Sequence, residues 1–330
     1  MLLLRASIRR LQARPALAKP WAEAGLEVAT RLDARRLQGI AHIHLEAIAQ
    51  ELGLHDRQHH EGEAIRLLSD AGADGLLATI LLNSAFARHE SGEWAEALER
   101  LDRAAAAFQR VGQGVDEVLS RSTAAMIMVL QGAHLEARRQ LAVADRISRT
   151  LGWRQGRAYA GYGLAFLDAA AGDLTTARRG FDEAEAVFAA EGIVPFVHEV
   201  RRWRAEALLR AGAAQECLEI VDGLISDAAR PPDPPLDLAA LRLRGHALAV
   251  LGRTDEAARQ VDEALNRAGE VGYAYEVALS LWAMEGLGAQ PLGLEYTARR
   301  LRIFAELGIT DGLTLAPCVP SGAPETDSGP

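Results

Sequence analysis

The chain has 330 residues, of which 49% are hydrophobic, 25% are charged and only 5% are aromatic, a balance typical of a globular protein that buries a core. Its net charge of −9 argues against a general nucleic-acid binder, because such proteins carry a basic face. No apolar run approaches the roughly 20 residues of a membrane span.

Residues 1–73 are predicted to form degenerate helical units. The apolar start ends at Arg5, which leaves it too short for the core of a signal peptide. Residues 20–31 have the pattern of the second helix of a helical hairpin. Residues 34–72 look like a further hairpin whose turn, over 53–61, is enlarged.

Histidines gather in and before that enlarged turn, where His55 and His59 are four residues apart. This spacing could place both on one helical face, where they could chelate a metal ion. No cysteine lies nearby, and the carboxylates at Asp56 and Glu61 are common neighbours anywhere. The sequence therefore favours a solvated, partly helical loop, and we predict no metal site.

Residues 74–272 form a regular repeat with a period of about 40 residues. One set of glycines keeps the period: Gly92, Gly132, Gly172, Gly212 and Gly252. A second set keeps it too, with Pro232 in the missing slot: Gly72, Gly112, Gly152, Gly192 and Gly272. Glycine adopts the left-handed conformation that ends helices more easily than other residues do. Each period is therefore predicted to be two helices joined by a turn.

Small residues recur at fixed distances from the first glycine set. Seven residues before it stand Ala85, Ala125, Ala165, Ala205 and Gly245, and five residues after it stand Ala97, Ala137, Ala177, Cys217 and Ala257. These small side chains allow the two helices of a hairpin to approach closely. Each hairpin has an apolar face that it buries only by stacking on its neighbours.

The repeat resembles the tetratricopeptide repeat. Residues 92–111 begin with the turn glycine and carry an aromatic residue, Trp94, two positions later and Ala97 five positions later. Residues 252–264 match nearly as well, without the aromatic residue. The usual period is about 34 residues, so the extra residues imply longer helices. The resemblance implies an all-α fold, a right-handed α-α superhelix of about seven helical hairpins.

The C-terminal part is predicted to close the stack. Residues 274–287 form a further first helix and 291–308 a closing helix, so 273–313 are capping helices. The solenoid therefore covers 1–313, and 314–330 are a disordered tail. The proline-rich stretch at 231–235 is a stiff loop rather than a domain boundary, because the phase of the repeat survives it.

No catalytic or cofactor motif is present. Lys19 is the only lysine, which excludes a phosphate-binding loop of the GxxxxGK type. Gly161 and Gly163 lie within a predicted helix and are expected to permit close packing. Cys217 occupies a small-residue slot and is predicted to be a buried small hydrophobe. Whether it pairs with Cys318 is open. We expect a protein that is not an enzyme and has no cofactor.

In tetratricopeptide arrays the first helix of each unit lines the concave surface. By that resemblance, residues six, nine or ten positions before the turn glycine form a partner-binding groove: Asn83, Phe86, Met126, Tyr162, Phe166, Arg202, Arg242 and His246. Such a groove would take an extended or helical peptide, apolar at one end and anion-seeking at the other. The alternative is that the apolar residues pack between helices and the arginines form a solvated face.

These features favour a non-catalytic protein–protein interaction scaffold in signalling or transcriptional regulation, with a protein or peptide partner and no direct nucleic-acid or membrane contact. The chain also resembles the C-terminal repeat arrays of bacterial multidomain ATPase and cyclase regulators, particularly at 299–308. That likeness implies an alternative, a sensor module that binds a small molecule or peptide in its concave groove. A cytoplasmic location is expected from the two widely separated cysteines. The oligomeric state, and whether the chain stands alone, are open.

Overall fold

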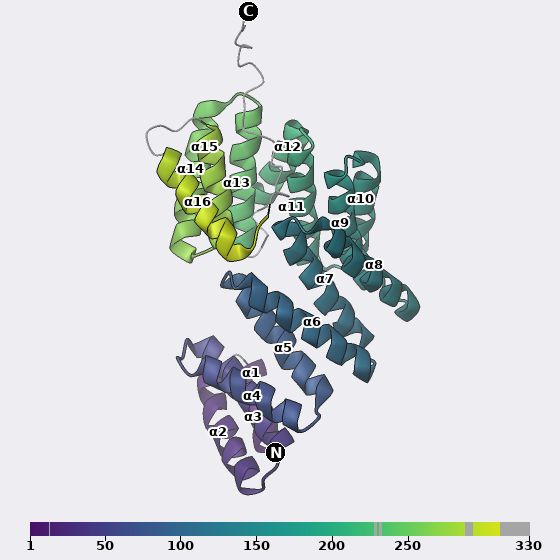
Figure 1. The fold of residues 1–330 in the computed structure, drawn as a ribbon, viewed down its shortest axis with the longest axis vertical. Coiled ribbons are helices and arrows are strands. Elements are labelled where there is room, and N and C mark those ends of the chain that lie inside the picture. Colours follow the sequence, from purple (N-terminus) through teal and green to yellow (C-terminus); the bar gives the residue numbers. More distant parts are fainter. Residues whose placement is uncertain (13, 228–229, 231–232, 288–292, 311–330) are drawn as a thin grey trace, which may run out of the picture. The chain divides into compact units, whose positions relative to one another are not determined.

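The computed structural model describes residues 1–12, 14–227, 230, 233–287 and 293–310. The predicted tail at 314–330 and Cys318 lie outside the described residues. The part of the chain that is described forms 16 α-helices and no strand (Figure 1), which confirms the all-α prediction. None of these helices is long and apolar enough to cross a membrane.

The helices follow one another with short turns. Their bounds are α1 Leu2–Leu11, α2 Pro15–Arg31, α3 Arg35–Leu52, α4 Arg57–Asp70, α5 Asp74–Glu90, α6 Trp94–Val111, α7 Gly114–Gln131, α8 His134–Leu151, α9 Arg154–Ala170, α10 Leu174–Ala190, α11 Val194–Arg210, α12 Ala214–Ser226, α13 Pro234–Val250, α14 Thr254–Val271, α15 Ala274–Gly286 and α16 Gly293–Leu307.

Each helix break predicted at a repeat glycine falls there, and the break predicted at Pro232 lies outside the described residues. All ten glycines of the two sets have positive φ, between 59° and 90°. At Gly92 the hydrogen bonds show why: its N–H donates to His89 O at 3.2 Å, and the N–H of Glu93 donates to Arg88 O at 2.8 Å. This paired arrangement satisfies the last carbonyls of the helix and requires a left-handed residue.

The N-terminal region is more regular than predicted. Residues 20–31 belong to α2, which pairs with a complete first helix, α1, rather than standing alone. The turn expected to be enlarged over 53–61 is short, because α4 begins at Arg57. The chain therefore contains eight successive pairs of helices in its described part, where about seven hairpins were predicted.

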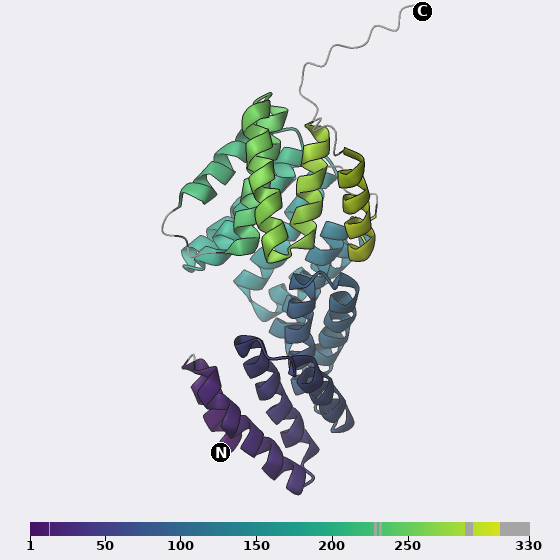
Figure 2. The same cartoon turned by 90° about the vertical axis from the view of Figure 1, so that its left-hand side faces the viewer.

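The chain divides into two compact units, Met1–Ala87 with Glu96–Ser120 and Arg88–Ala95 with Arg121–Pro330. In the first unit, α1 to α4 pack in order, and α1 also contacts α3. In the second unit, the first helix of each hairpin contacts the first helix of the next, since α11 contacts α9 and α13, and α13 contacts α15. Figures 1 and 2 show α13, α14 and α15 side by side in this unit.

Helices α13 and α14 approach each other closely at Gly245, in the small-residue slot. A Cβ there would lie 2.5 Å from Val261 Cγ2 and 3.2 Å from Val261 N. We expect Gly245→Ala to destabilise the protein by about 1–3 kcal/mol through overpacking, partly offset by up to about 1 kcal/mol of helix propensity. Urea denaturation measures this. Gly223→Ala is the control, because nothing lies within 4 Å of its Cβ position. Equal effects of the two substitutions would contradict the packing argument.

Candidate functional site: an inner pocket of the second unit

The predicted groove residues are not on one open surface. In the first unit, Asn83 and Phe86 are exposed, Phe86 by 41%. Five others in the second unit are at most 8% exposed: Met126, Tyr162, Phe166, Arg242 and His246. The reason is the packing of successive first helices against one another, which covers the face on which these residues lie. Arg202 is half-buried and lines a pocket.

Three apolar members of the predicted groove, Met126, Tyr162 and Phe166, are core residues. The ring of Phe166 meets that of Trp203 edge to face, with centroids 5.0 Å apart. A Cβ at Gly163 would be 3.0 Å from the sulfur of Met126, so Gly163 permits close packing as predicted. The alternative expectation, that the apolar residues pack between helices, describes these positions.

The arginines of the predicted groove are neutralised by carboxylates inside the protein. Arg242, which is fully buried, donates from Nη2 to Glu206 Oε2 and from Nε to Glu276 Oε2, both at 2.7 Å. Arg210 donates to the other oxygen of Glu206 at 3.1 Å. Arg202 makes a bidentate pair with Glu199, at 2.8 and 3.2 Å. The charges of Arg202 and Arg242, which were expected to attract an anionic ligand, are therefore neutralised by carboxylates of the protein itself.

The pairing controls the ionisation of the buried groups. Burial alone would raise the pKa of Glu206, but the charges of Arg242 and Arg210 outweigh it and hold that pKa well below its usual range. Burial, followed by the charge of Arg242, lowers the pKa of His246 to about 3. Within the described residues, Arg242 Nη1 and His246 Nε2 have no hydrogen-bond partner.

The pocket forms where distant segments of the second unit meet. Trp94, at the start of α6, is 3% exposed and lies against Tyr275, with ring centroids 5.3 Å apart. At the end of α7, the side-chain nitrogen of Gln131 donates to Leu307 O at 2.8 Å. The N–H of Thr310 donates back to Gln131 O at 3.1 Å. The end of α16 is thus held against the end of α7.

The cavity has a volume of about 240 Å³. Its aromatic lining is His89, Trp94, Tyr273 and Tyr275, and its charged lining is Glu90, Glu199, Arg202, Asp233 and Glu276. Burial and then the charge of Arg202 lower the pKa of His89, so the imidazole is neutral near pH 7. Glu199 pairs with Arg202, and Glu276 pairs with Arg242. The excess negative charge of the lining therefore comes from Glu90 and Asp233.

This combination of groups favours a cationic ligand. Aromatic faces attract ammonium and guanidinium groups within about 6 Å of the ring. The excess of carboxylates adds a Coulomb attraction that is strong in a partly enclosed site. The pocket is smaller than the roughly 300–1,000 Å³ of most ligand sites, which suits a compact molecule.

The N-terminal histidines assemble differently from the expectation. His42 and His60 approach, with their Nδ1 atoms 3.0 Å apart, and the ring of His59 lies 5.4 Å from that of His60. His55 remains exposed. No group of three or more His, Cys, Asp or Glu side chains in the described ranges is arranged to hold a metal ion.

Cys217 is buried as predicted. Its exposure is zero, and burial raises the pKa of its thiol to about 12. A thiol with so high a pKa is protonated at neutral pH and is therefore a poor nucleophile.

The aromatic residues of the pocket escaped the sequence-based prediction. Tyr273 and Tyr275 have no aromatic counterparts one period earlier, so a search for periodic positions passes over them, and Trp94 was assigned only to the turn of the repeat. The departure of these two tyrosines from the repeat pattern was the sequence signal that could have identified them. Comparison with known protein families and with curated proteins finds no match to this chain. The likeness to tetratricopeptide arrays therefore rests on the repeat itself.

Proposed function

We propose that the chain is a non-catalytic sensor module, and that the inner pocket of its second unit binds a small organic cation. The proposal rests on one observation, a cavity of about 240 Å³ lined by four aromatic rings and by two carboxylates, Glu90 and Asp233, in excess of the internal ion pairs. A bound cation would lie against the rings and neutralise the excess negative charge.

The position of the pocket supports a regulatory role. Its walls come from the α5–α6 turn, α11, α13, α15 and the end of α16. A ligand that contacts several of these segments stabilises the arrangement that holds them together, because it binds the native state and not the unfolded chain. Ligand binding would thereby strengthen the contact between α16 and the end of α7.

The test is a thermal-shift and calorimetric titration with tetramethylammonium, putrescine and agmatine. We expect at least one of these cations to raise the melting temperature, by the equivalent of about 2.7 kcal/mol at one hundred times its Kd. Tyr273→Leu and Glu90→Gln should each weaken binding about tenfold, since each removes an interaction worth roughly 1 kcal/mol or more.

The matched control is Tyr296→Leu, which removes a half-buried tyrosine from α16 that is not among the pocket-lining residues. It should bind the cation like the wild type. If none of the three cations shifts the melting temperature, or if Tyr273→Leu binds as tightly as Tyr296→Leu, the pocket is not a cation site.

A protein-interaction scaffold is the second candidate function. It is supported by the exposed side chains of Asn83 and Phe86, which lie three residues apart on α5 and so share one face of the first unit. The two functions are compatible, because these residues and the inner pocket belong to different units.

A further inference from the structure

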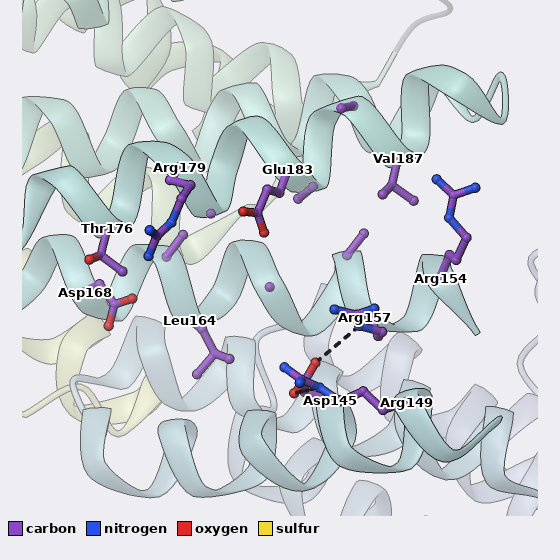
Figure 3. A pocket seen from close by; sticks show the side chains of 16 residues that line it. Asp145, Arg149, Arg154, Arg157, Leu164, Asp168, Thr176, Arg179, Glu183 and Val187 are labelled. Carbon is purple, nitrogen blue, oxygen red and sulfur yellow. Dashed lines mark hydrogen bonds and ion pairs between the residues drawn. The ribbon is translucent and has the colours of Figure 1, made fainter. Parts of the chain in front are cut away.

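A second hollow lies on the outer side of the hairpins, between α8 and α10 and over α9 (Figure 3). Its volume is about 580 Å³. All its lining residues belong to the second unit. We call it the outer groove, and it is separate from the inner pocket.

Two glycines shape the outer groove. A Cβ at Gly180 would lie 2.9 Å from Ala165 Cβ, so the close packing of α10 on α9 accounts for that glycine. Nothing lies within 4 Å of a Cβ at Gly161, which faces the open groove. A glycine inside a helix costs roughly 1 kcal/mol relative to alanine, and packing gives no reason for this one.

The neighbouring repeats fill the same slot with arginine. One period earlier, Arg121 Nη1 donates to Gln140 Oε1 at 3.0 Å, and Gln140 occupies the slot of Gly180. One period later, Arg201 Nε donates to Glu185 Oε1 at 2.8 Å and so joins α11 to α10. The groove over α11 that contains this pair has a volume of about 440 Å³. Gly161 therefore lacks the arginine side chain that occupies the equivalent slot of the two neighbouring repeats.

The charged groups of the outer groove are partly engaged. Asp145 pairs with Arg149 at 2.8 Å and with Arg157 at 3.9 Å. Arg154 and Arg179 are exposed, and among the described residues neither forms an ion pair. Figure 3 shows them toward opposite ends of the groove. These two guanidinium groups are the available anchors.

Helix geometry gives the separation of these anchors. Arg179 is next to Gly180, which packs on Ala165, and Ala165 lies three helical turns after Arg154 on α9. At a pitch of about 5.4 Å per turn, this separation is about 16 Å along the helix. An extended peptide spans the same length with about five residues.

We propose that the outer groove binds an acidic peptide segment of a partner protein, with one carboxylate on Arg154 and another on Arg179. Guanidinium and carboxylate form bidentate, charge-assisted hydrogen bonds. Glu183 and Asp145 also line the groove, between the two anchors in Figure 3, and Asp168 lines it beyond Arg179. These carboxylates repel a nucleic acid, whose backbone carries a phosphate at every residue, but they leave room for a peptide with separated charges.

The test selects phage-displayed random dodecapeptides on the full chain and measures their affinities by fluorescence polarisation. We expect selected peptides with two separated acidic residues, bound at least tenfold more weakly by Gly161→Arg and by Arg154→Glu. The first substitution installs the residue of the neighbouring repeats. It should leave the melting temperature unchanged or higher, because arginine is the better helix former.

The matched control is Gly223→Arg, on α12 in the lining of the neighbouring groove, where a Cβ again meets nothing within 4 Å. It should bind the peptides like the wild type. The proposal is overturned if no peptide is selected, if the selected peptides lack acidic residues, or if Gly161→Arg binds them as tightly as Gly223→Arg. If the wild-type chain binds single-stranded RNA and Gly161→Arg abolishes that binding, the peptide proposal is likewise overturned in favour of a nucleic-acid site.

Discussion

Arg242→Met is expected to destabilise the second unit by about 3–5 kcal/mol, the usual effect of removing one partner from a buried ion pair. The arginine is fully buried and holds two carboxylates, Glu206 and Glu276. Without it, Glu206 keeps only Arg210, and Glu276 loses its ion-pair partner. Methionine fills much of the volume but neutralises neither charge. Urea denaturation followed by circular dichroism measures the loss.

The matched control is Arg244→Met, two residues further along α13. Arg244 pairs with Asp222 and Gln260 but is partly exposed, so water replaces the lost contacts and we expect a change below about 1 kcal/mol. Similar losses for the two variants would mean that the buried cluster contributes no more than a surface pair.

Stability is expected to fall as the pH is lowered from 7 toward 4, and His42 should carry much of this effect in the first unit. Burial, reinforced by the charge of His60, lowers the pKa of His42 to about 4 in the folded protein, against 6.5 when exposed. As the pH falls through 6.5 the unfolded chain takes up a proton that the folded chain refuses. The free energy of unfolding therefore falls by up to about 1.4 kcal/mol per pH unit in this window.

The charged neighbours of His42 do not reverse this sign. Glu63 raises its pKa, whereas His59 and Arg66 lower it. Urea denaturation at pH 7 and pH 4.5 should show a smaller difference for His42→Gln than for the wild type. His55→Gln, at an exposed position, is the control and should keep the wild-type difference. If both variants retain it, His42 is not responsible.

In the second unit, His246 should act in the same direction. Its pKa of about 3 lies below that of His42. The fall in the free energy of unfolding that it causes therefore continues to a lower pH. Hydrogen exchange resolves the two units separately and should show both losing protection below pH 6.5.

Within the regular repeats, the amino-acid sequence by itself determined the helix ends at the glycines and how the hairpins repeat. The reason is local: glycine adopts the left-handed turn most easily, and all ten repeat glycines have positive φ. It also determined that Cys217 would be buried and that position 245 would tolerate only a small side chain. A residue that recurs in the same slot of several hairpins meets the same neighbour each time.

The sequence could not determine which inner residues would remain accessible. Periodicity places Arg202 and Arg242 on equivalent faces, yet Arg202 lines the pocket and Arg242 is fully buried. The difference arises because Glu206 and Glu276, from neighbouring first helices, enclose Arg242. A one-dimensional pattern contains no information on which charges meet across helices.

The inner pocket itself was decided only by tertiary structure. It depends on the end of α16 reaching the end of α7, where Gln131 and Leu307 form a hydrogen bond across 176 positions of the chain. Local propensity and the period of the repeat say nothing about so distant a contact. It follows from the small rotation between successive hairpins, summed over the second unit, and that sum is fixed by the packing of every pair of helices.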